Sequence, residues 1–306
     1  MVAVVLAIVV STAAGVWAEQ RWGGRAGIAS RRSLLFVLYV VLPPTTFFNL
    51  AAARIDADVG FGIVLAIVAV AAATGVAYLV GSRLLRLERA SVGSMLCCAL
   101  VGNTGYLGYA MVAVLLGFDR LSEAAVYDIL VAAPALLLGA FSVGAAFGTE
   151  AGEGPRERVG AFFTRNPPLY AALLGLLAPD SLAPDVLVDA SRIAIVAVLP
   201  LGFFAVGAAL AEEAEEGALP FPPPLDAPVA AAVAIKLVVA PALLFALAVP
   251  LIDLPGTYLL LAAMPCGINT MIVTHAYGLD LRLTASAVAW STAIAVSAAL
   301  VASLLA

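Results

Sequence analysis

The stretch Ala99–Ala110 reads ALVGNTGYLGYA and lies inside an otherwise apolar segment of the chain. Gly102 and Gly105 flank Asn103 and Thr104 near the middle of that segment. Because glycine frees the backbone, the stretch predicts an interruption in a helix that would otherwise cross a membrane. Unpaired backbone groups at membrane depth cost several kcal/mol each unless they face protein or a water-filled cavity. The interruption therefore predicts a site inside the protein.

The composition of the chain is that of a membrane protein. Of its 306 residues, 64% are hydrophobic and 11% are charged, and the mean hydropathy is +1.10. Soluble domains carry roughly 25% charged residues, so this chain has too few to cover a core. Apolar runs long enough to cross a ~30 Å hydrocarbon layer recur along it. We predict ten helical spans, at about residues 1–18, 33–53, 59–80, 92–117, 122–148, 167–178, 188–211, 227–249, 256–278 and 282–306.

The distribution of positive charge predicts the orientation. Arginines gather in the odd-numbered loops, at Arg21, Arg25, Arg31, Arg32, Arg83, Arg86, Arg89, Arg156, Arg158, Arg165 and Arg282. By the positive-inside rule these loops are cytoplasmic, and both termini lie outside a plasma or inner cell membrane. The net charge of −5 argues against a nucleic-acid partner.

Two short motifs recur in the same order in the two halves of the chain. VLPPTTFF at 41–48 matches VLPLGFF at 198–204, and Asn103-Thr104 matches Asn269-Thr270. The matching spans are five apart, and since five is odd the second half enters the membrane with opposite orientation. This pattern predicts two inverted five-helix repeats, residues 1–148 and 167–306, joined by a cytoplasmic linker at residues 149–166.

The second motif repeats the interruption as well. Span nine contains MPCGINT at 264–270, in which Pro265 removes a backbone donor and Gly267 frees the chain. Small residues and a lone Asn also serve close helix packing, which is the alternative interpretation. The matched pair favours a shared midplane site, where half-helix N-termini attract an anion. The candidate substrate-binding residues are Gly102, Asn103, Thr104, Gly105, Pro265, Gly267, Asn269 and Thr270.

The runs GNTGYLG in span four and MPCGINTMIVTHAYGLD in span nine resemble the motifs of the auxin efflux carrier family, within the superfamily of bile acid, arsenite and riboflavin transporters. RNPPL at the start of the second half extends the resemblance, whereas LGYA lacks a proline that the family usually has. The resemblance implies an all-α fold in which broken spans four and nine cross, with Asn103 and Asn269 lining the substrate site. It also implies carriage of auxin-like or other small carboxylates, and a homodimer.

Two charged residues fall inside predicted spans, Asp128 in span five and Lys236 in span eight. Either ion costs about 2.5–3.5 kcal/mol near the bilayer centre, so each is a functional candidate. One interpretation is a permanent ion pair that holds the bundle together. The other is that Lys236 attracts the anion while Asp128 couples transport to a proton or sodium. Cys97, Cys98 and Cys266 have no paired metal spacing and are expected to be packing residues, without a cofactor.

The leading hypothesis is a secondary carrier that exports small organic anions by alternating access, in an elevator-like manner. Spans one, two, six and seven would form a scaffold, and spans three to five and eight to ten a moving core. The alternative is a sodium- or proton-coupled carrier of the bile-acid-symporter or sodium/proton-antiporter type. An intramembrane enzyme is disfavoured because the chain has no G-x-S-x-G or H-E-x-x-H motif and no pair of membrane-buried aspartates.

Overall fold

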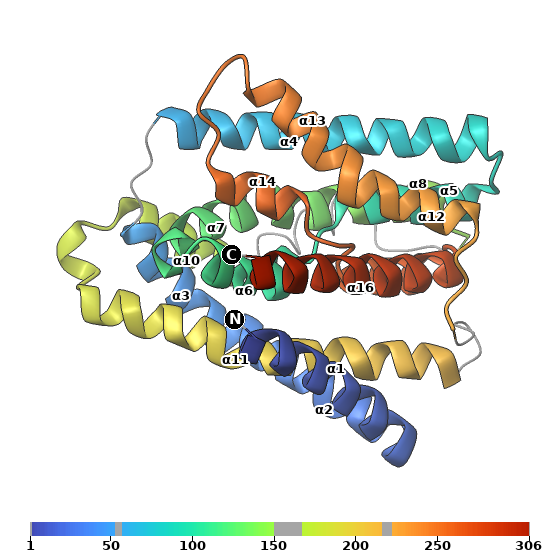
Figure 1. The fold of residues 1–306 in the computed structure, drawn as a ribbon, viewed down its shortest axis with the longest axis horizontal. Coiled ribbons are helices and arrows are strands. Elements are labelled where there is room, and N and C mark those ends of the chain that lie inside the picture. Colours follow the sequence, from blue (N-terminus) through green and yellow to red (C-terminus); the bar gives the residue numbers. More distant parts are fainter. Residues whose placement is uncertain (1, 53–56, 150–166, 216–221, 306) are drawn as a thin grey trace.

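The computed structural model describes residues 2–52, 57–149, 167–215 and 222–305, and its regular elements are helices throughout this part (Figure 1). The α-helices are α1 (Val2–Trp22), α2 (Arg25–Phe36), α3 (Leu42–Ala51), α4 (Ala57–Leu79), α5 (Arg89–Leu100), α6 (Tyr109–Leu115), α7 (Leu121–Tyr127), α8 (Phe141–Phe147), α10 (Pro167–Leu177), α11 (Asp185–Glu215), α12 (Ala227–Ala234), α13 (Ala240–Ala248), α14 (Gly256–Ala262), α15 (Asn269–Tyr277) and α16 (Leu281–Leu305). Short π-helical or 3-10 segments lie between them at η1 (Val37–Val41), η2 (Val80–Leu84), η3 (Thr104–Gly108), η4 (Phe118–Arg120), η5 (Asp128–Ala132), η6 (Ala135–Ala140), η7 (Asp180–Leu182) and η8 (Ile235–Val239).

Several of these π-helical segments join neighbouring α-helices into longer continuous helices. Within the residues that the structure describes, four helices are able by length and composition to cross a membrane: Val59–Leu84, Phe118–Phe147, Ala227–Ala248 and Leu281–Ala302. Two shorter apolar helices, Arg89–Leu100 and Thr104–Leu115, divide the expected fourth span between them. The all-helical, membrane-spanning class is therefore confirmed, and the arrangement as ten spans in two inverted repeats stays a prediction.

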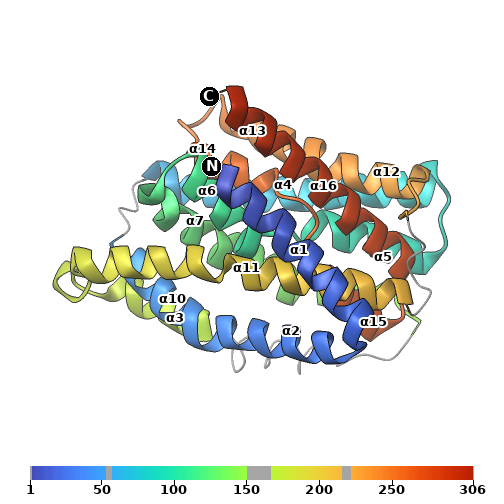
Figure 2. The same cartoon turned by 60° about the horizontal axis from the view of Figure 1, so that its bottom comes forward.

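The helices form two groups. The peripheral group (α1–α3, α10 and α11) lies together on one side in Figures 1 and 2, and the central group (α4–α8 and α12–α16) lies on the other. Helix α1 packs closely along α11 because glycines leave room for the facing backbone. A Cβ atom added at Gly15 would collide with the Phe204 carbonyl, and one at Gly207 with the Thr12 carbonyl.

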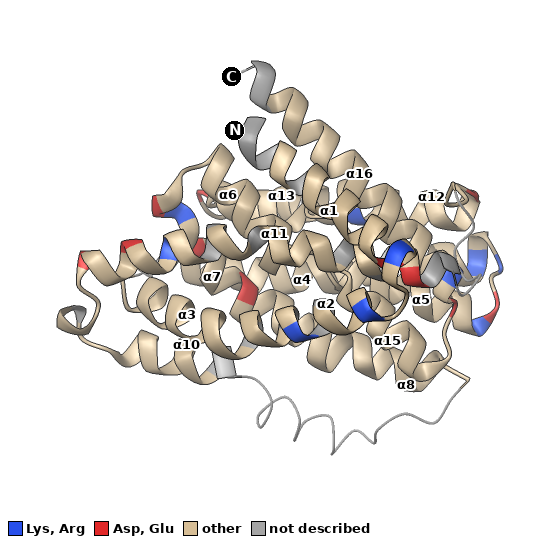
Figure 3. Ribbon diagram, turned by 90° about the horizontal axis from the view of Figure 1, so that it is seen from below, with Lys and Arg blue, Asp and Glu red and all other residues tan. Residues whose placement is uncertain are grey.

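Charged residues lie mostly toward the two ends of the helices, and the middle of the molecule is largely uncharged (Figure 3). This distribution suits a protein whose middle crosses a hydrocarbon layer. Of the predicted linker, only Thr149 is within the described residues, where its hydroxyl donates to the Gly278 carbonyl at 2.9 Å. The remainder of that prediction, residues 150–166, lies outside them.

Candidate functional site

The interruption predicted from the glycines is present in both motifs. Helix α5 ends at Leu100 and the next helical residue is Thr104, with Val101 in extended conformation between them. In the second half, α14 ends at Ala262 and α15 begins at Asn269. We call the two non-helical stretches, 101–103 and 263–268, the paired breaks.

The paired breaks run antiparallel and bond to each other. The Asn103 N–H donates to the Pro265 carbonyl at 2.8 Å, and the Gly267 N–H donates to the Val101 carbonyl at 2.9 Å. These two bonds flank a bridge between Gly102 and Cys266. Each break thus supplies partners for backbone groups that the other leaves outside its helices, as a low-dielectric interior requires.

Close approach explains two of the glycines. A Cβ atom at Gly267 would lie 2.9 Å from the Gly102 carbonyl oxygen, a backbone atom. A Cβ atom at Gly102 would lie 3.1 Å from the Lys236 ammonium nitrogen. The glycines therefore admit the facing backbone on one side and a buried cation on the other.

The two asparagines do not occupy equivalent positions. Asn103 precedes its half-helix and caps it, because its side-chain oxygen accepts the Leu107 N–H at 3.2 Å. Asn269 is instead the first residue of α15, and its half-buried amide makes no hydrogen bond with the part of the chain that the structure describes. Of the two side chains, Asn269 is the one available to a ligand.

The two half-helix starts also differ in their free donors. Thr104, Gly105 and Tyr106 begin a half-helix, so their N–H groups have no intrahelical partner. At the start of α15, Thr270 and Met271 donate back to the Gly267 and Ile268 carbonyls at 3.0 and 2.9 Å. The first break therefore offers more N–H groups to an anion than the second.

Lys236 and Asp128 reach the same break from different helices. The Lys236 side chain comes from η8, lies against Gly102 and is only 3% exposed. Asp128 is half-buried at the start of η5 and accepts a hydrogen bond from the Thr104 hydroxyl at 2.5 Å. Among the described residues the Lys236 ammonium has neither an ion pair nor a hydrogen bond. The permanent Asp128–Lys236 pair considered from the sequence is thus not formed here.

Two other residues support the site. One lies in no sequence motif, and the other belongs to the GNTGYLG motif but was not predicted to have this role. Ser291 of α16 accepts the Cys266 N–H at 3.1 Å and so satisfies another backbone donor of the second break. The ring of Tyr106, part of GNTGYLG, packs against Gly202 of α11, where an added Cβ atom would collide with the ring. This contact joins the first break to the peripheral group.

The cysteines are free, buried thiols, and the Cys266 Sγ lies 3.6 Å from the Cys98 carbonyl oxygen. Within the described ranges, no group of three His, Cys, Asp or Glu residues is arranged to hold a metal ion. These thiols fill space beside the paired breaks, as small apolar residues do.

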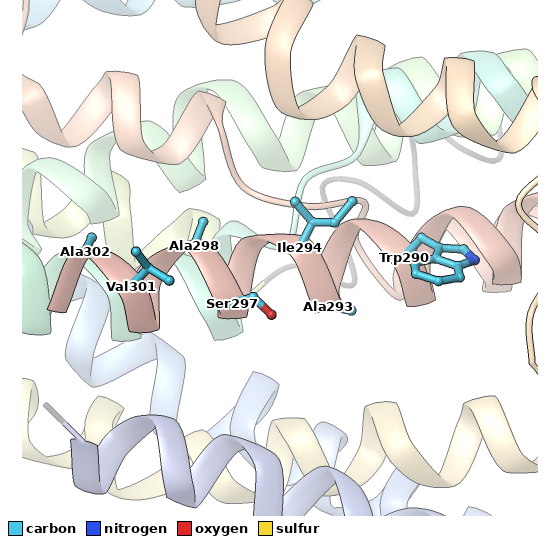
Figure 4. Close-up of a pocket in the computed structure, with 7 residues that line it drawn as sticks. All are labelled: Trp290, Ala293, Ile294, Ser297, Ala298, Val301 and Ala302. Carbon is cyan, nitrogen blue, oxygen red and sulfur yellow. The ribbon is translucent and has the colours of Figure 1, made fainter. Parts of the chain in front are cut away.

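A separate groove of about 700 Å³ runs along one face of α16 (Figure 4). It is lined by Trp290, Ala293, Ile294, Ser297, Ala298, Val301 and Ala302. The lining is mainly apolar and includes no residue of the paired breaks. This groove is therefore not the site that the two motifs predict.

Comparison with known proteins gives the class of the molecule. A family model described as "Membrane transport protein" matches residues 162–303. The protein named "Uncharacterized transporter MJ1031", from Methanocaldococcus jannaschii, is 24% identical over 265 residues, which cover 82% of each chain. Both matches confirm the resemblance to the auxin efflux type of membrane transport family. They point to a multi-pass membrane transporter and not to an enzyme.

Proposed function

We propose that the protein is a secondary carrier of small organic anions, such as auxin-like or other carboxylates, and that it binds them at the paired breaks. The observation that carries this proposal is the Lys236 ammonium, buried beside Gly102 with neither an ion pair nor a hydrogen bond among the described residues. A buried charge is costly unless it is paired, so the site is suited to a ligand that brings the opposite charge.

The surrounding groups fit a carboxylate. One oxygen would meet the Lys236 ammonium, and the N–H groups at the start of η3, from Thr104 to Tyr106, would add donors and a partial positive charge. The Asn269 amide would bind the other end of the ligand, which gives selectivity without a further charge. The remaining candidate residues would shape the breaks around the ligand: Gly102, Gly105, Pro265, Gly267 and Thr270.

Asp128 is the residue that we assign to coupling. Its hydrogen bond from Thr104 links a half-buried carboxyl directly to the first break. Gain of a proton by this carboxyl would change that bond and the net charge beside Lys236. A sodium site needs several converging oxygens, and those of Asp128 and Thr104 are too few. A proton-coupled carrier is therefore the second candidate, and a sodium-coupled one fits less well.

Transport would follow from the two groups of helices. In this proposal the peripheral group is the scaffold of a homodimer in a cell membrane, with both termini extracytoplasmic. The central group is the moving core, formed by spans three to five and eight to ten of two inverted repeats. The Tyr106–Gly202 contact is where the core would slide on the scaffold, and export is the expected direction.

The test is uptake of radiolabelled indole acetate, malate, malonate and lactate into proteoliposomes, with and without imposed proton and sodium gradients. We expect saturable flux in the wild type and loss of it in Asn269→Ala, with Ser297→Ala in the α16 groove as the matched control. If no carboxylate moves, or if Asn269→Ala transports normally, the proposal fails.

A further inference from the structure

Two contacts at opposite ends of the central group have the same chemistry. The Ser91 hydroxyl donates to a carboxylate oxygen of Asp280 at 2.7 Å, and the Thr257 hydroxyl donates to a carboxylate oxygen of Glu123 at 2.6 Å. In Figure 1, α5 and the start of α16 lie at one end of the central group, and α14 and α7 lie at the other. We call these two hydrogen bonds the end contacts.

The end contacts also match in their places along the chain. Ser91 and Thr257 lie in the first turns of α5 and α14, the helices that lead into the two breaks. Asp280 and Glu123 lie at the starts of α16 and α7, the helices that follow the broken spans nine and four. Each contact thus joins the helix that leads into one break to the helix that follows the other break.

Those following helices hold the breaks directly. From Glu123, the chain continues through α7 to Asp128, which accepts from Thr104 at the first break. From Asp280, the chain continues along α16 to Ser291, which accepts the Cys266 N–H at the second. The Thr257–Glu123 contact therefore links α14, which leads into the second break, to α7, which leads to Asp128 at the first break. The Ser91–Asp280 contact links α5, which leads into the first break, to α16, which carries Ser291 at the second break.

The end contacts are also chemically strong. A hydroxyl that donates to an ionised carboxylate forms a shorter and stronger bond than a neutral pair. Thr257 is 1% exposed, and Asp280 also caps α16 by accepting the Leu283 N–H at 2.9 Å. Glu123 has a second partner in Arg120, which donates to its Oε1 at 2.8 Å, so each oxygen of the Glu123 carboxylate accepts a hydrogen bond.

We propose that Ser91, Asp280, Thr257 and Glu123 are positioning residues that fix the two breaks relative to each other and so set the affinity of the site for its anion. The part of this inference that concerns affinity rests on the proposed function, whereas the part that concerns the position of the breaks does not. The reciprocal arrangement is what an inverted repeat produces, since the symmetry that exchanges the halves also exchanges the two contacts.

The test uses Ser91→Ala and Thr257→Val, which remove the hydroxyls, beside Ser91→Thr and Thr257→Ser, which keep them. Ser82→Ala and Ser122→Ala are matched controls, because those exposed hydroxyls bond only to carbonyls nearby in their own chain segments. The first readout is hydrogen exchange, which needs no substrate. We expect at least about tenfold faster exchange at Asn103 and Gly267, with exchange in α1 and α11 unchanged.

The second readout is uptake of the radiolabelled carboxylate that the wild type carries best. Because a less preorganised site binds its ligand more weakly, we expect the KM of Ser91→Ala and Thr257→Val to rise about tenfold with the maximal rate retained. The hydroxyl-retaining variants should restore the wild-type KM. Unchanged exchange at the breaks, or a loss of folded protein with KM unchanged, would overturn the proposal. If the wild type carries no anion, the proposed function fails, while the exchange result still decides whether these residues fix the two breaks relative to each other.

Discussion

Gly267→Ala is the substitution from which the paired breaks predict the largest structural effect. The new Cβ atom would lie 2.9 Å from the Gly102 carbonyl oxygen and 3.0 Å from Val101 Cγ1, so the breaks must separate. Overpacking costs about 1–3 kcal/mol, and weakening the two flanking hydrogen bonds adds about 0.5–1.5 kcal/mol each. We therefore expect a loss of roughly 2–6 kcal/mol in the free energy of unfolding.

The native thiols provide the assay. Cys97, Cys98 and Cys266 are fully buried, so a fluorogenic maleimide reports their exposure as the protein unfolds in detergent. At about 2 °C per kcal/mol for a chain of this size, the unfolding temperature should fall by roughly 4–12 °C. The control is Gly75→Ala in the interior of α4, where a Cβ atom meets nothing within 4 Å. If both variants unfold at the wild-type temperature, the close approach of the breaks is refuted.

Three further substitutions test separate parts of the site. Lys236→Met should raise the unfolding temperature, because a membrane-buried charge costs about 2.5–3.5 kcal/mol; a lower temperature in the thiol assay would show that Lys236 is paired. Thr104→Val should destabilise by about 1.5–3 kcal/mol through loss of the bond to Asp128, whereas Thr104→Ser should not; equal unfolding temperatures would contradict this. Gly202→Val should slow uptake because its side chain meets the Tyr106 ring, and adding Tyr106→Ala should restore the rate; a double variant as slow as the single one would exclude this contact.

Sequence reasoning reached the class of fold and the location of the breaks. Composition decides between a soluble and a membrane protein, and Gly102 and Pro265 mark places where a helix cannot continue normally. The same reasoning found Lys236 and Asp128, since an ionisable residue stands out in an apolar run. These predictions depend on local chemistry, which the sequence displays directly.

The parts that could not be predicted depend on how helices are rotated about their axes and where they start. The sequence placed Asp128 and Lys236 inside predicted spans but did not give the directions they face, so an ion pair stayed open until the structure placed Thr104 beside Asp128. The matching Asn-Thr pairs suggested equivalence, yet Asn103 caps a half-helix and Asn269 begins one. Ser291 carries no motif, and only the fold brings it to Cys266.

The measurement that tests the central claim most directly is carboxylate uptake by Lys236 variants in proteoliposomes. If the buried ammonium receives the anion, Lys236→Gln abolishes uptake while the protein stays folded, and Lys236→Arg, which keeps the charge, retains a measurable part of it. Normal uptake by Lys236→Gln would contradict the claim and show that the anion binds elsewhere.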